Sequence, residues 1–171
     1  MIAYLKENMT GERTPFTTTV EYGRYGNNLR FKFCAENSQR FSAYSEDNEP
    51  IYTGDVVEVF ICTGNDLTEY YELEVAPNGT IFFGKVKNDG KLHLSFLPKT
   101  FTAEVKNTET GYETEIIIPY STINAGKNPI RFNAFRIETE GGVPEKNLLA
   151  LNPTLCDTFH RPDKFIIFDE D

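Results

Sequence analysis

Hydrophobic and polar residues alternate along most of this chain, which is the pattern of β-strands with one buried face. Successive side chains of a strand point to opposite faces of its sheet, so each alternating run places its apolar residues on one side. The alternating runs are residues 29–36, 57–62, 70–75, 101–106, 112–118, 130–137 and 165–168. The residues that we expect to face the core are Val57, Val59, Ile61, Leu73, Val75, Ile116 and Ile118.

Turn-forming residues separate these runs. Glycine combined with Asn, Asp, Pro or Glu occurs at residues 26–28, 64–66, 77–79, 88–90 and 109–111, and a Gly-Gly pair occurs at 141–142. Many short strands with turns at this spacing indicate an all-β fold, an antiparallel β-sandwich of jelly-roll or immunoglobulin-like type. We expect little helix beyond one short turn at 119–123.

The chain is expected to form a single domain over residues 1–171. No linker, internal repeat or low-complexity block divides it, and its length is typical of one domain with a sizeable core. Residues 1–14 precede the first clear alternating run, so they could form a loose N-terminal segment.

The charge balance excludes one class of partner. The 26 acidic residues outnumber the 17 basic ones, which gives a formal net charge of −9. Nucleic-acid binders carry a dense basic patch, and this chain has none, so we expect no nucleic-acid partner. No apolar run approaches the roughly 18–20 residues that span a bilayer, so we expect no membrane partner either.

The N-terminal sequence has no apolar core segment and no small-residue cleavage site, so it does not read as a signal peptide. We therefore expect a cytoplasmic protein, or an extracellular one if the chain is an excised domain. Cys34, Cys62 and Cys156 lie far apart without metal-binding spacing, which indicates reduced thiols that pack as small hydrophobes.

Carboxylates are the candidate chemistry that remains, because the sequence has no nucleophile elbow, phosphate loop, HExxH or CxxC motif. Glu72 and Glu74 share one face of a strand, and Glu58 could lie on a neighbouring strand. Paired carboxylates about 5–9 Å apart would suit glycoside hydrolysis. Solvated residues on a half-exposed sheet are the simpler interpretation. The acidic loop at residues 45–50 could hold a structural calcium ion, although a solvated loop explains it equally.

Four segments in order resemble the family nine carbohydrate-binding modules of the DOMON-like superfamily. They are DNEPIYTGDVVEVFICTGNDLTEYYELEVAPNGTIFFG (47–84), YETEIIIPYSTI (112–123), IRFNAFRIE (130–138) and LNPTLCDTFHRPDKFIIF (151–168). The resemblance covers about residues 20–168. It implies the same sandwich fold and a sugar held between two aromatic rings, with hydroxyl groups hydrogen-bonded at the rim.

The resemblance places the two aromatic rings at Tyr52 and Phe159 and a hydroxyl acceptor at Glu58. This chain departs from the family pattern in three ways. It contains no Trp, Glu74 stands near the position of an expected basic residue, and Asp157 lies beside the position of an expected asparagine. Ordinary core packing is the alternative role for both rings.

We therefore expect non-catalytic binding of a mono- or oligosaccharide, in polysaccharide catabolism. The expected site residues are Tyr52, Phe159, Glu58, Asp157, His160 and Arg136, the last three at the rim. No cofactor is expected apart from the calcium ion. The alternatives are a glycan-processing hydrolase that uses the acidic face, an inert β-sandwich that mediates interactions, and a haem domain with Met9 as an axial ligand.

Overall fold

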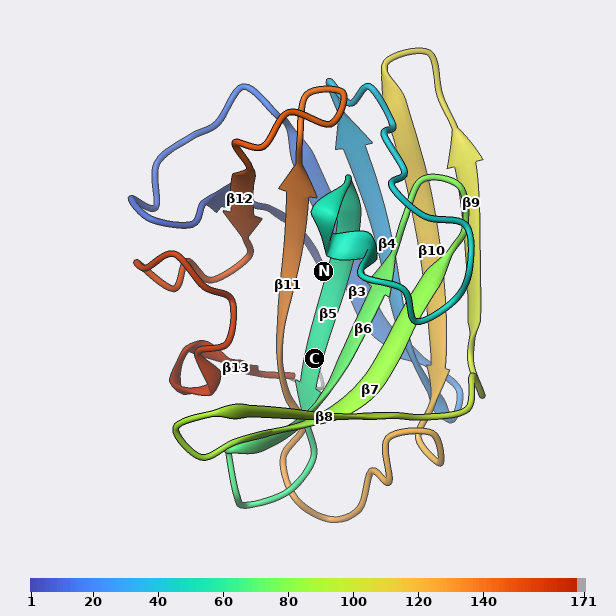
Figure 1. Cartoon of the computed structure of the whole chain (residues 1–171). Helices are drawn as coiled ribbons and strands as arrows, with labels where there is room; N and C mark the ends of the chain where they lie inside the picture. The colour runs from blue at the N-terminus through green and yellow to red at the C-terminus, as the bar shows by residue number, and fades with distance from the viewer. Residues whose placement is uncertain (169–171) are drawn as a thin grey trace.

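The protein is described by a computed structural model over residues 1–168, in which two antiparallel sheets pack face to face (Figure 1). The five-stranded sheet has the order β1 (Ile2–Tyr4), β3 (Thr18–Tyr25), β4 (Asn28–Glu36), β10 (Gly111–Pro119) and β9 (Thr102–Asn107). We call it the first sheet.

The second sheet has eight strands. Its order is β2 (Lys6–Glu7), β12 (Asn147–Ala150), β11 (Arg131–Glu138), β5 (Val56–Cys62), β6 (Glu69–Val75), β7 (Ile81–Asn88) and β8 (Leu92–Phe96), and β13 (Ile166–Ile167) pairs with β11. The only helical elements within residues 1–168 are two 3-10 turns, η1 (Ile51–Thr53) and η2 (Pro162–Lys164). The predicted antiparallel β-sandwich with little helix is confirmed.

The core between the sheets is built by the alternation that the sequence displays. Val57, Val59 and Ile61 of β5 and Leu73 and Val75 of β6 point toward the first sheet and are at most 1 % exposed. Ile116 and Ile118 of β10 meet them from the other side and are fully buried. All seven residues predicted to face the core do so.

The outer face of the second sheet is also largely covered, which explains why every residue of β5 is buried. A second apolar cluster lies there, formed by side chains such as Phe60, Phe82 and Phe135 together with Ile51 of η1 and Phe165 beside η2. Three segments therefore border this face: the loop with η1, the chain from 151 to 165, and β8. In Figure 1, η1 lies against the upper part of β5, and β8 runs across the lower ends of β5, β6 and β7.

The N-terminal segment is tied to both sheets and is not loose, contrary to the expectation for residues 1–14. β1 pairs with β3, and β2 pairs with β12. Between these strands Leu5 is buried in the core. The buried Asn8 then donates to the Thr154 hydroxyl at 2.7 Å and accepts from the Thr154 amide at 2.9 Å. This anchoring gives the segment apolar burial and backbone pairing that local patterning did not reveal.

The three cysteines are free thiols, and each is buried or half-buried, as expected. Among residues 1–168, no helix has the length and apolar character needed to cross a membrane.

Candidate functional site

A pocket of about 570 Å³ opens on the outer face of the second sheet. Its floor comes from β5, β6 and β7, which contribute Glu58, Phe60, Glu72, Glu74, Phe82 and Val86. Its walls come from the loop at 48–52, from β8, from residues 157–160, and from Lys146. The segments that cover the sheet therefore leave one hollow over its centre, and sequence positions more than 100 residues apart meet there.

Tyr52 lies in η1 at the edge of this pocket and is 42 % exposed. Its ring meets Phe82 edge-on, with the ring centroids 6.4 Å apart. The Lys146 ammonium lies 5.3 Å from the centre of the Tyr52 ring and donates to the Tyr52 carbonyl oxygen at 2.6 Å. Tyr52 thus has a supported backbone and a partly open ring, which is what a stacking residue requires.

Phe159 lines the same pocket but is 6 % exposed. One face of its ring stacks on Phe135, with centroids 4.2 Å apart and planes 17° apart. Phe159 therefore does two things: it closes the apolar cluster on the outer face, and it presents its remaining surface to the pocket. Core packing and ligand contact, which the sequence left as alternatives, are both geometrically available to it.

Asp157 and His160 flank Phe159 and also line the pocket. The imidazole Nδ1 of His160 lies 2.8 Å from the Tyr70 hydroxyl, and its ring centroid lies 5.2 Å from that of Phe60. Burial lowers the pKa of His160 to about 4, so this side chain is neutral at pH 7. Asp157 is exposed and supplies a carboxylate at the rim.

The prediction that Arg136 lies at the rim is wrong. Arg136 pairs with Val57 across β11 and β5, so both side chains point between the sheets, away from the pocket. It is fully buried, its guanidinium lies 2.6 Å from the Glu138 carboxylate, and it donates to the Glu36 carbonyl oxygen at 2.9 Å. Arg136 is therefore a structural ion-pair partner inside the sandwich. Its neighbour Phe135, opposite Glu58, has the side chain on the outer face.

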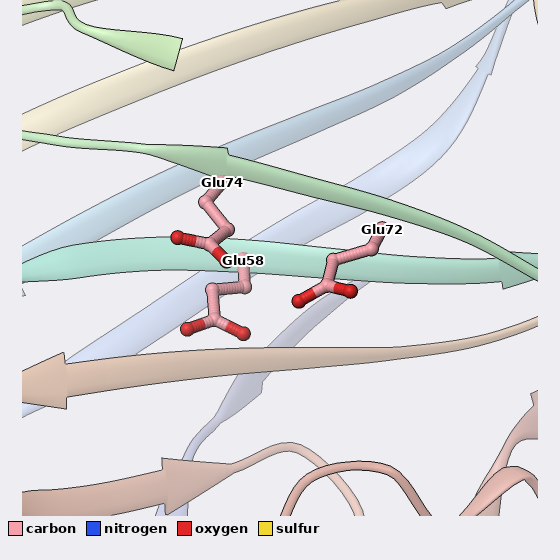
Figure 2. Close-up of side chains that lie close together, drawn as sticks. All are labelled: Glu58, Glu72 and Glu74. Atoms are coloured by element: carbon pink, nitrogen blue, oxygen red, sulfur yellow. The ribbon is translucent and has the colours of Figure 1, made fainter. Parts of the chain in front are cut away.

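Three glutamates converge on the pocket floor (Figure 2). Glu58 and Glu74 are direct partners across β5 and β6, and Glu72 lies two residues before Glu74. One carboxylate oxygen from each lies within 4.8 Å of the other two. The exposed fractions are 2 % for Glu58, 8 % for Glu72 and 1 % for Glu74, so the interpretation of these residues as solvated is wrong. We call Glu58, Glu72 and Glu74 the acidic floor.

Burial raises the pKa of all three floor carboxyls because a charged carboxylate loses its hydration there. The pKa of Glu72 rises to about 7, and a hydrogen bond with Glu74 partly offsets this rise. Burial also raises the pKa values of Glu58 and Glu74 well above the ordinary value, and the neighbouring negative charges add to this effect. Burial therefore makes it costly for all three floor carboxyls to be charged at the same time.

Lys146 is the one basic side chain that lines the pocket within residues 1–168, since His160 is neutral. Its positive charge lowers the pKa of Glu58 and Glu74, although burial is the larger effect on both. No ion pair within 4.0 Å joins a basic side chain of residues 1–168 to the acidic floor. The negative charge of the pocket is thus only partly balanced from inside the protein.

Several pocket residues escaped the sequence analysis. Leu92, Leu94 and Phe96 alternate along β8 and form an apolar wall, with Phe96 lying edge-on to Phe82 at 5.3 Å. The alternation of these three residues with His93 and Ser95 was a usable strand signal. Lys146, in contrast, lies in a charged stretch before β12 with no motif around it.

The acidic loop at 45–50 lies beside β7 and uses its side chains to hold the backbone. The Asp47 carboxylate accepts from the Ile81 amide at 2.9 Å, and the Asn48 side-chain oxygen accepts from the Phe83 amide at 3.0 Å. These bonds fix the loop that carries η1, and with it Tyr52. Calcium binding by this loop stays a prediction.

Comparisons with known proteins fit this architecture. A family model described as carbohydrate family 9 binding domain-like matches residues 3–165. No curated protein matches the chain significantly.

Three solved structures are similar to the chain. A candidate carbohydrate-binding protein from Bacteroides uniformis has a TM-score of 0.77 and 13 % identity, over 96 % of this chain and 84 % of its own. A carbohydrate-binding module of family 9 from Caldicellulosiruptor kristjanssonii was solved with cellotriose. It has a TM-score of 0.69 and 15 % identity, and the match covers 96 % of this chain and 79 % of that module. A family 9 module from the same organism was also solved with glucose. It has a TM-score of 0.70 and 14 % identity, and the match covers 99 % of this chain and 84 % of that module.

Proposed function

The chain belongs to the carbohydrate family 9 binding domain-like family, and we propose that it binds a sugar in the pocket over β5, β6 and β7 without catalysing a reaction. One observation carries the proposal: a single pocket collects Tyr52, Glu58, Asp157, Phe159 and His160 from segments that are distant in the sequence. The likeness to modules solved with glucose and cellotriose supports a sugar as the ligand class.

In the proposed complex, the C–H face of a pyranose packs on the Tyr52 ring, with Phe159 on a second side. Aromatic rings bury the apolar face of a sugar, and polar groups at the rim take the hydroxyls. Glu58 accepts hydroxyl hydrogen bonds from the floor, and Asp157 does so from the rim. Because Tyr and Phe present less area than Trp, we expect a Kd in the high micromolar to millimolar range, or about 4–6 kcal/mol.

We propose a role in polysaccharide catabolism as a binding module, with no chemistry of its own. The raised pKa of Glu72 would suit a general acid, which makes a hydrolase the competing function. The pocket brings together no nucleophile, orienting base and oxyanion donors by motif. Incubation with cello-oligosaccharides should release no reducing ends, and release that disappears in Glu72→Gln would establish the hydrolase instead.

Isothermal titration with glucose and cellotriose tests the binding proposal. The wild-type protein should bind at least one of them, and Tyr52→Ala should abolish measurable binding. Tyr25→Ala is the matched control, since Tyr25 is a 60 % exposed tyrosine on β3 of the first sheet. Loss of binding in Tyr52→Ala alone supports the pocket, whereas equal binding by both variants refutes it.

A further inference from the structure

The pocket is more acidic than recognition of a neutral sugar requires. Four carboxylates line it, those of Glu58, Glu72, Glu74 and Asp157, against the single ammonium of Lys146. A sugar hydroxyl needs one acceptor, and one carboxylate can serve several hydroxyls. Three buried carboxylates in contact range of one another are costly, since each must lose its hydration next to like charges.

One carboxylate oxygen of the acidic floor also lacks a donor from the protein. The Oε2 atom of Glu74 is buried and has no hydrogen-bond partner. The ammonium of Lys146 donates to the Tyr52 carbonyl oxygen at 2.6 Å, and it makes no ion pair with the acidic floor. Buried acceptors without a donor are rare in folded proteins, and a ligand that donates would satisfy them. The chemistry that fits three converging carboxylates is a positively charged group with several N–H donors.

The walls around this floor are apolar. Phe60, Phe82, Phe96 and Phe159 line the pocket together with Leu92 and Leu94. Such walls suit a ligand with an apolar body, and a cation can also lie over an aromatic ring. The pocket as a whole is therefore complementary to a molecule that combines a pyranose-sized C–H surface with an ammonium group.

We propose that the preferred ligand of this pocket is a cationic amino sugar, whose ammonium group donates to Glu58, Glu72 and Glu74 while its ring packs on the aromatic walls. This inference rests on the proposed function and specifies its substrate class. The charge of the pocket disfavours acidic sugars by direct repulsion. N-acetylation of the amine would remove the charge and add bulk at the floor, so N-acetylated sugars should gain nothing over neutral ones.

A divalent cation explains the pocket less well. Calcium takes six to eight oxygen ligands. The three floor carboxylates could supply at most six of them. A bare ion would also leave the apolar walls without a role. The pocket fits an organic cation better because it uses the floor and the walls together.

The test compares three trisaccharides that share a β-1,4-linked pyranose backbone: the glucosamine trimer, cellotriose and the tri-N-acetylglucosamine trimer. Isothermal titration at neutral pH, with EDTA present, should show the glucosamine trimer binding at least about tenfold tighter than cellotriose. The acetylated trimer should bind no tighter than cellotriose. Glu74→Gln and Glu72→Gln keep the side-chain shape, so each should reduce glucosamine-trimer affinity to that of cellotriose while retaining cellotriose binding.

Glu104→Gln is the matched control, because it removes the same charge from an exposed position on β9 of the first sheet. It should keep the glucosamine preference. Equal loss of preference in Glu104→Gln would overturn the proposal in favour of non-specific attraction to an acidic protein. Binding of cellotriose without a glucosamine preference would overturn it while leaving sugar binding intact.

Two further outcomes are decisive. If none of the three trisaccharides binds, the proposed function fails together with this inference. If calcium alone binds the wild-type protein but not Glu74→Gln, while the glucosamine trimer shows no preference, the floor is a metal site and the amino-sugar proposal is wrong. Circular dichroism and the Tm of each variant establish that the fold is retained before binding is compared.

Discussion

Glu58 of β5 and Glu74 of β6 are direct partners across the second sheet, and both side chains are almost completely buried at the floor of the pocket. Like charges opposite each other destabilise a sheet, and burial adds to the cost because it removes hydration. Nothing in the packing of residues 1–168 requires carboxylates there. The pair should therefore lower the stability of the free protein at neutral pH.

The first prediction is that Glu74→Gln stabilises the free protein at neutral pH. The folded state raises the pKa of this carboxyl, so the wild-type protein is most stable below the unfolded pKa of 4.5 and loses that stability as pH rises. Glutamine does not titrate and escapes the loss. The Tm of the variant should exceed that of the wild type by several degrees at neutral pH, at roughly 2–4 °C per kcal/mol for a domain of this size.

The difference in Tm should shrink when the pH falls toward 4.5, because the wild-type carboxyls are then protonated as well. Thermal melts of the wild type, Glu74→Gln and the exposed control Glu104→Gln across this range provide the measurement. A Tm gain in Glu74→Gln that is independent of pH would show that ionisation of the Glu74 carboxyl does not lower the stability of the folded protein.

The second prediction concerns Lys146, which holds η1 through the Tyr52 carbonyl oxygen. Lys146→Gln shortens the side chain and removes the charge next to the Tyr52 ring. The positioning of Tyr52 should loosen, and the affinity for cellotriose should fall severalfold, as measured by isothermal titration. Lys106→Gln, an exposed change on β9, should leave this affinity unchanged. An unaltered affinity in Lys146→Gln would mean that η1 is held without this contact.

The third prediction separates the two aromatic residues by their burial. Tyr52→Ala should change the Tm by only a few degrees, because the ring is 42 % exposed. Phe159→Ala removes a ring that stacks on Phe135 and should cost about 3–5 kcal/mol in the free energy of unfolding. The two changes should therefore differ in their effect on stability although both rings line the pocket. Urea denaturation of both variants checks the contrast.

The fourth prediction tests the core between the sheets. Val59 is fully buried within the main apolar cluster, so Val59→Ala should lower the free energy of unfolding by about 1–3 kcal/mol through lost burial and a cavity. Urea denaturation provides the number, and sugar affinity should be retained because the Val59 side chain faces away from the pocket. A change below a few tenths of a kcal/mol would place Val59 outside a tightly packed core.

Local alternation was enough to predict the sandwich and its inner face. It placed Val57 and Leu73 correctly, because a buried inner face imposes period-two patterning on a strand. The family resemblance, which extends over most of the chain, supplied Tyr52 and Phe159. Each of these predictions depends on information that lies within one strand or one motif.

The burial of the acidic floor could not be predicted in the same way. Whether Glu72 is solvated depends on covering segments from η1, β8 and residues 157–160, which are distant in sequence. The error at Arg136 has a different cause. Phe132, Ala134 and Arg136 share one face of β11, and the burial of the first two in the core indicated an inward Arg136. The prediction that Arg136 lies at the rim followed from its residue type. It did not use the rule that alternate residues of a strand share one face.

The most direct test of the central claim is a crystal structure of the protein grown with cellotriose. We predict a sugar ring in the pocket over β5, β6 and β7, packed against Tyr52 and Phe159, with a hydroxyl donating to the Glu58 carboxylate. A sugar bound on the first sheet or at another edge of the sandwich, with the pocket empty, would contradict the account.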